Sequence, residues 1–173
     1  MEHRRSGATI IPLIVSTDKT KLAQFRDKQA YPIYLTIGNI PKQIRRKVTS
    51  HAQILLGYIP VTKLTSICGV TACRWALTNL FHACMQNALG PISSYGKTGL
   101  DMKCGNGVWW RCHPIFASFV GDYPEQVLVT CTYNGRCPKC KVPLGQLGKY
   151  QMFLQHVQCY ERTISQSRVA YSR

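Results

Sequence analysis

The stretch "IIPLIVSTDKT", residues 10 to 20, places an aspartate directly after an apolar run. The stretch "FVGDYPEQVLVTC", residues 119 to 131, has the same arrangement about a hundred residues later. Acidic residues are scarce in this chain, since its 173 residues include only 7 Asp and Glu. Asp18 and Asp122, placed alike at the ends of two apolar runs, are therefore the first candidates for a functional site.

The segments around these aspartates predict an alternation of strands and helices. Residues 71–89 carry apolar side chains at helical spacing, and Gly90-Pro91 predicts the end of that helix. Residues 114–121 predict a fourth core strand. Three earlier segments are rich in apolar, aromatic and β-branched residues in the manner of strands, namely 8–16, 30–38 and 51–59.

A tight hairpin is predicted within residues 102–112, because Asn106-Gly107 lies between two short runs. Trp109 and Trp110 follow this turn and are candidates for stacking on unpaired bases. Adjacent residues of a strand point to opposite faces, so we expect core packing to explain at least one of the two indoles.

Three strands, a helix and a further strand with an acid at its end is the order of a ribonuclease H-like fold. The expected fold class is therefore α/β, a partial ribonuclease H-like mixed sheet with a hairpin insertion and a small cysteine-rich segment resembling a zinc knuckle. In that fold the first and fourth strands are neighbours, so Asp18 and Asp122 would converge as hard oxygen ligands of Mg²⁺. We expect the core at residues 8–128, the cysteine-rich segment at 129–160 and a tail at 161–173.

A purely structural explanation of the two aspartates stays open. The sequence Asp122-Tyr-Pro-Glu125 is a capping box, with Asp at the N-cap, Pro in the first turn and Glu three residues on. Asp18 could likewise cap a short turn over "KTKLAQF", residues 19–25.

The composition indicates a polyanionic partner. With 22 Lys and Arg against 7 acids, the formal net charge is +15. The basic residues are scattered between strand-like segments rather than along one helix face, and no apolar stretch is long enough for a membrane span, so nucleic acid is favoured over a membrane. One connection concentrates four cations that could contact phosphates or simply be solvated: Lys42, Arg45, Arg46 and Lys47.

A cysteine cluster is the second chemical signal. Nine Cys is an odd number without the framework of a small secreted domain, which favours reduced thiols or metal ligands over disulfides. Cys131, Cys137 and Cys140 could supply three thiolates to Zn²⁺, with His156 or Cys159 as the fourth ligand. Partly buried thiols without metal are the alternative.

Five strings carry a resemblance to a known family: "STDKTKL" (16–22), "YPIYLTIGNIPKQIRRK" (31–47), "SHAQILLGYIPVTKL" (50–64), "RCHPIFASFVGDYPEQVLVTCT" (111–132) and "GRCPKCKVPLGQLG" (135–148). Together they resemble the Plavaka group of fungal transposases, in the Kyakuja-Dileera-Zisupton superfamily of DDE-type elements, over residues 8 to 152.

The resemblance implies a ribonuclease H-like core with three acidic ligands of Mg²⁺ or Mn²⁺, which cuts and rejoins transposon ends in the nucleus. By this resemblance Asp18 is the first acid and Asp122 the second, and DNA is the partner. The third acid is expected further downstream, on a helix that this chain lacks. Glu125 fits a capping partner better, and Glu161 lies where the resemblance has faded.

We therefore expect a fragment or decayed copy of a transposase that does not cleave DNA alone. A non-catalytic basic nucleic-acid-binding module with a zinc knuckle is the alternative.

Overall fold

The computed structural model of the chain describes residues 8–23, 28–133, 135–138 and 145. The chain divides into two compact units, Met1–Val120 and Gly121–Arg173. The first unit holds a mixed sheet and a long helix, and the second begins with a short helix. The protein is thus of the mixed α/β class, as the sequence predicts.

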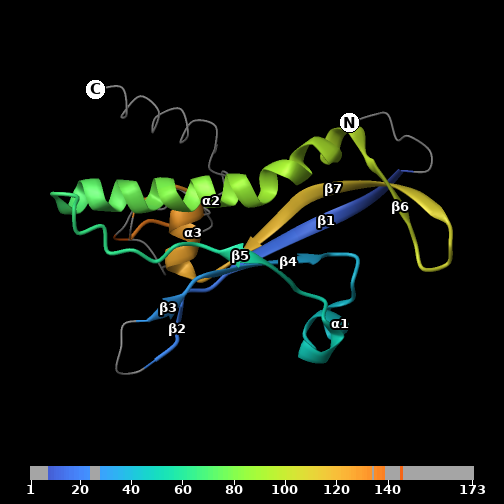
Figure 1. The fold of residues 1–173 in the computed structure, drawn as a ribbon, viewed down its shortest axis with the longest axis horizontal. Helices are drawn as coiled ribbons and strands as arrows, with labels where there is room; N and C mark the ends of the chain where they lie inside the picture. Colours follow the sequence, from blue (N-terminus) through green and yellow to red (C-terminus); the bar gives the residue numbers. More distant parts are fainter. Residues whose placement is uncertain (1–7, 24–27, 134, 139–144, 146–173) are drawn as a thin grey trace. The chain divides into compact units, whose positions relative to one another are not determined.

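A five-stranded sheet in the order β5-β4-β1-β7-β6 organises the first unit (Figure 1). The pairs β5–β4, β4–β1 and β7–β6 are antiparallel, and β1–β7 is parallel, so the sheet is mixed. The bounds of these strands are Ala8–Thr17 for β1, Pro32–Ile37 for β4, Ile54–Tyr58 for β5, Leu100–Lys103 for β6 and Trp109–Val120 for β7.

The parallel pairing of β1 with β7 confirms that the first and fourth core strands are neighbours. Leu13, Val15 and Thr17 alternate along β1 and are all buried, so they share one face of the strand. The register shifts after Leu13, which pairs with Phe116, because the next residue of β1 pairs with Ser118. This bulge leaves Ala117 as the extra residue of β7.

β7 is longer than predicted. The second arm of the hairpin, predicted within residues 102–112, and the fourth core strand, predicted at 114–121, form one continuous strand that includes Pro114. Proline has no N–H to donate to a ladder, but β6 pairs with β7 only as far as Cys112. From residue 113 onward no strand among the described residues pairs with that side of β7, so Pro114 is tolerated there.

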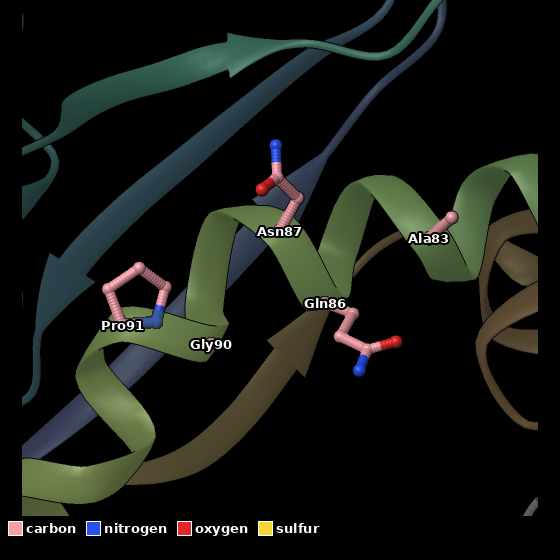
Figure 2. Close-up of a pocket in the computed structure, with 5 residues that line it drawn as sticks. All are labelled: Ala83, Gln86, Asn87, Gly90 and Pro91. Carbon is pink, nitrogen blue, oxygen red and sulfur yellow. The ribbon is translucent and has the colours of Figure 1, made fainter.

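The predicted end of the main helix at Gly90-Pro91 is wrong. Helix α2 runs from Val70 to Thr98 with Pro91 inside it. A proline removes one hydrogen bond and clashes with the carbonyl four residues earlier, which bends a helix without having to end it. Figures 1 and 2 show that α2 changes direction along its course, with Gly90 and Pro91 at the turn.

An open hollow of about 460 Å³ lies beside this bend (Figure 2). None of its lining residues is titratable, so no acid, base or metal-ligand chemistry is assigned to it. They are Ala83, Gln86, Asn87, Gly90 and Pro91.

α2 contacts β7, and it contributes one fully buried aromatic residue to the core of the first unit. Phe81 is 2% exposed, and its ring lies 6.1 Å from that of Tyr31, just before β4. Burying such a ring stabilises a fold by about 2 to 3 kcal/mol. Among the described residues, no helix is both long and apolar enough to cross a membrane.

The remaining elements of the first unit are short. β2 and β3 form a separate two-stranded sheet, and two single-turn helices connect β4 to β5. Their bounds are Thr20–Lys21 for β2, Gln29–Ala30 for β3, Lys42–Arg45 for α1 and Val48–Ser50 for η1.

Gly99 joins α2 to β6 in a backbone conformation that only glycine adopts readily, with φ 75° and ψ 161°. A Cβ atom built on Gly99 would lie 2.7 Å from Nε of Arg111 and 2.9 Å from the ring of His113. Both neighbours are engaged with the end of α2. Arg111 donates to the carbonyl of Thr98 at 2.5 Å, and the ring of His113 lies 3.2 Å from the carbonyl of Gly96.

Gly99→Ala should therefore lower the free energy of unfolding by about 1 to 3 kcal/mol. The matched control is Gly57→Ala in β5, where a Cβ meets nothing within 4 Å, and which should leave stability unchanged or raise it slightly. Denaturant titration measures both. Equal stability of the two variants would show that the connection between α2 and β6 tolerates a side chain at position 99.

Candidate functional site

The two candidate acids follow the carboxyl ends of the parallel strands β1 and β7. Ser16 pairs with Val120 at those ends. Asp18 comes two residues after Ser16, and Asp122 comes two residues after Val120. The carboxyl ends of β1 and β7 are therefore neighbours in the sheet, and each lies shortly before an aspartate in the sequence. Asp18 belongs to the first unit and Asp122 to the second.

Asp18 is exposed, and its carboxylate makes no hydrogen bond or ion pair with a described residue. The prediction that it caps a helical turn is wrong for the described part of that segment, because Thr20–Lys21 forms β2 and pairs with Gln29–Ala30. The hydroxyl of Thr20 donates to the main-chain carbonyl of Asp18 at 3.5 Å, which leaves both carboxylate oxygens available.

Asp122 caps helix α3, Tyr123–Val129, as the capping-box spacing predicts. Its Oδ1 accepts the backbone N–H of Glu125 at 3.0 Å, and Pro124 occupies the first turn. Glu125 is 7% exposed, as befits a residue packed at the start of the helix. The cap fixes the Asp122 side chain through one oxygen, while its Oδ2 makes no hydrogen bond with a described residue.

The cysteine segment begins where α3 ends. Cys131 has a left-handed φ of 52°, and its N–H donates to the carbonyl of Leu128 at 3.3 Å. The N–H of Thr132 donates to the carbonyl of Val127 at 3.1 Å, which completes a Schellman motif. Glycine is the usual residue at this left-handed position, so a cysteine there carries a conformational cost.

A tight turn separates Cys131 from Cys137. The N–H of Arg136 donates to the carbonyl of Tyr133 at 3.1 Å. The hydroxyl of Tyr123 holds this turn from α3, since it accepts the N–H of Gly135 at 2.8 Å and donates to the carbonyl of Arg136 at 3.0 Å. Both cysteines are half-buried on either side of a turn that is tied to the first residue of the helix.

The predicted zinc site is described only in part. Cys140, His156 and Cys159 lie outside the described residues, as does Glu161. In the part of the chain that the structure describes, no group of three or more His, Cys, Asp and Glu side chains could hold a metal ion. Burial raises the pKa of the Cys131 thiol, so a metal ion binding there would have to displace a proton that is held more firmly than usual.

The four cations of the predicted DNA-binding cluster lie on α1 and the residues that follow it. Lys42, Arg46 and Lys47 are exposed and Arg45 is half-buried. None of the four makes an ion pair with a carboxylate of a described residue. Their charges are therefore available to an external polyanion.

Trp109 and Trp110 are both exposed, at 67% and 43%, so the expectation that one of them is packed in the core is wrong. They lie at the start of β7, where, within the described residues, the strand paired with them is β6 at the edge of the sheet. The sequence signal for this exposure is their position close to the Asn106-Gly107 turn, with only Val108 between the turn and Trp109.

The described part of the chain thus combines an exposed aspartate, a helix-capping aspartate, two half-buried cysteines and four cations without a carboxylate partner. The family model described as Plavaka transposase matches residues 1–172 of this chain. The chain therefore belongs to the Plavaka transposase family. Neither a curated protein nor a solved structure matches it.

Two substitutions of Asp122 separate its capping role from its charge. Asp122→Ala should cost about 1 kcal/mol of stability, because the N–H of Glu125 is left without its acceptor. Asp122→Asn should cost only a few tenths of a kcal/mol, since asparagine caps about as well as aspartate. Thermal unfolding of the two variants beside the parent measures the difference, and equal losses in both would mean that the charge, not the cap, stabilises α3.

Proposed function

We propose that this chain is the DNA-binding, ribonuclease H-like core of a transposase, in which Asp18 and Asp122 share a divalent metal ion. Membership of the Plavaka transposase family supports a transposase-related function with DNA as partner. Such a protein acts on chromosomal DNA, so we propose the nucleus as its location.

The parallel pairing of β1 with β7 carries this proposal. Three antiparallel strands in the order β5-β4-β1, followed by a parallel neighbour of β1, form the sheet arrangement on which the ribonuclease H-like interpretation rests. The register of Ser16 with Val120 places the carboxyl ends of β1 and β7 side by side in the first unit. That Asp18 and Asp122, which follow these ends, hold one metal ion is what the family resemblance implies. A site at the carboxyl ends of parallel strands is also where open α/β sheets bind their ligands.

The two aspartates would contribute differently. The cap holds Asp122 through Oδ1 and leaves Oδ2 to bind a cation, whereas Asp18 is exposed and can adjust to it. Mg²⁺ or Mn²⁺ fits this donor set, because both ions prefer hard carboxylate oxygens. Once bound, such an ion would polarise a phosphodiester and stabilise its leaving oxygen. The third acid that the family resemblance implies stays a prediction.

The cluster of Lys42, Arg45, Arg46 and Lys47 would bind the DNA backbone. Each phosphate that a cation neutralises releases counterions, which makes the affinity fall with salt. Sequence is read at base edges, so contacts to phosphates alone predict binding that tolerates different sequences.

Replacing Arg45, Arg46 and Lys47 with Gln should therefore lower the slope of log affinity against log salt by about one unit for each phosphate that the protein no longer neutralises. Fluorescence anisotropy with a labelled DNA duplex at several salt concentrations measures this slope. The matched control replaces Lys21, Lys28 and Arg74 with Gln, which removes the same charge from three exposed positions outside the cluster.

A smaller slope in the cluster variant than in the control would assign the cluster to DNA. Equal slopes in the two variants would show that only the total charge matters, and an unchanged slope in the cluster variant would assign these side chains to solvent.

A non-catalytic nucleic-acid-binding module with a zinc knuckle is the second candidate. The turn tied to Tyr123 and the cysteine at a position that favours glycine support it. In this proposal Cys131, Cys137 and Cys140 bind Zn²⁺ with His156 or Cys159. Elemental analysis should then find about one zinc ion per chain, and none when the three cysteines become serine. Folded protein without zinc would contradict it.

A further inference from the structure

The hairpin of β6 and β7 presents two different faces. Lys103 pairs with Trp109 and Asp101 with Arg111, while Met102 pairs with Trp110. Residues directly opposite each other share a face and successive residues alternate. Trp109 therefore lies on the face of the charged side chains, and Trp110 lies on the other face with Met102.

The ion pair of Arg111 with Asp101 at 2.9 Å confirms this assignment of faces. Arg111 also donates to the carbonyl of Thr98, so its guanidinium holds the base of the hairpin to the end of α2. Lys103 makes no ion pair with a described residue. The cation directly across from Trp109 is thus available to an external anion.

The turn that carries this pair is well defined. The N–H of Cys104 donates to the carbonyl of Val108 at 2.9 Å, and the N–H of Gly107 donates to the carbonyl of Cys104 at 2.9 Å. Oδ1 of Asn106 accepts the N–H of Val108 at 3.1 Å, and Gly107 supplies the positive φ of 81° that the turn requires. These hydrogen bonds hold the backbone next to Trp109 in one conformation, so little conformational entropy is lost when a ligand binds to its ring.

The charge of the first unit indicates what kind of partner could bind the exposed indole of Trp109. The described residues of the first unit include twelve Lys and Arg but only two Asp, and one of those two is paired with Arg111. A partner must therefore combine a flat apolar surface with negative charge. An unpaired nucleotide has both, since its base stacks on an indole and its phosphate suits an ammonium group.

We propose that Trp109 and Lys103 form a stacking platform for an unpaired base of DNA. This inference rests on the proposed function, because it takes DNA as the partner and adds a preference for single-stranded or unpaired segments. Trp110 lies opposite Met102 on the other face of the hairpin, away from Lys103, and is not part of the platform.

The test compares a single-stranded oligonucleotide with the corresponding duplex. Trp109→Ala should weaken binding of the single strand by about tenfold or more and leave duplex binding nearly unchanged. Trp109→Phe should keep most of the affinity, because it retains an aromatic ring. Trp110→Ala is the matched control and should bind both DNAs as the parent does. Quenching of indole fluorescence by the single strand should largely disappear in Trp109→Ala, which a merely structural role for the ring would not produce.

Three results would overturn the platform while leaving the proposed function intact. They are parent-like binding of the single strand by Trp109→Ala, an equal loss for single strand and duplex, and an equal loss in Trp110→Ala. If the parent chain binds neither DNA, the proposed function fails and this inference fails with it. Far-UV circular dichroism of each variant shows whether its fold is retained, and Trp109→Phe tests the ring if Trp109→Ala does not fold.

Discussion

The parallel pairing of β1 with β7 is the constraint on which the rest of the first unit depends. It joins two strands that lie about a hundred residues apart in the chain, and β4 and β6 then add to the outer sides of this pair. A parallel pair needs a long crossover connection, and α2 is part of the chain between β1 and β7. The bulge after Leu13 sets the register that brings Ser16 opposite Val120. Each of these two residues, at the carboxyl end of its strand, lies two positions before an aspartate, Asp18 or Asp122.

Asp122 illustrates how one side chain can satisfy local structure and still be suited to function. Its Oδ1 is committed to the N–H of Glu125, as any N-cap would be. A carboxylate can accept several hydrogen bonds, so the cap leaves capacity for a cation. The cap also fixes the side chain, which reduces the entropic cost when a ligand binds. The structural and functional explanations of this residue are therefore compatible.

Much of the sheet could be predicted from local patterns, whereas features that depend on tertiary context could not. The alternation of residues in β1, β4 and β5 and the Asn106-Gly107 turn predicted those elements, because both signals are local. The end of α2 was predicted wrongly at Pro91, since proline weakens a helix locally but packing against β7 carries it further. The burial of Trp109 or Trp110 was also predicted wrongly. Alternation places one of two neighbours on each face, but it does not say whether a face is covered.

In the candidate site, too, features set by local sequence could be predicted and features set by tertiary contacts could not. The cap at Asp122 was predicted from the spacing of four residues, and the structure confirms it. The cap at Asp18 was not found, because pairing of β2 with β3 outweighed any preference of that segment for a helical turn. The requirement for glycine at position 99 was not predicted, because it arises from contacts with Arg111 and His113 on another strand. Only the folded chain brings such neighbours together.

The most direct test of the account is Mn²⁺ binding by the parent chain, followed by electron paramagnetic resonance of the free ion. Asp18→Asn and Asp122→Asn should each lower the affinity by on the order of tenfold, because each removes one charged ligand, while asparagine at position 122 keeps the helix cap. Asp101→Asn is the control, since it removes an exposed carboxylate that pairs with Arg111, and it should bind Mn²⁺ as the parent does. Equal affinity in all four proteins would contradict the proposal that Asp18 and Asp122 hold one metal ion.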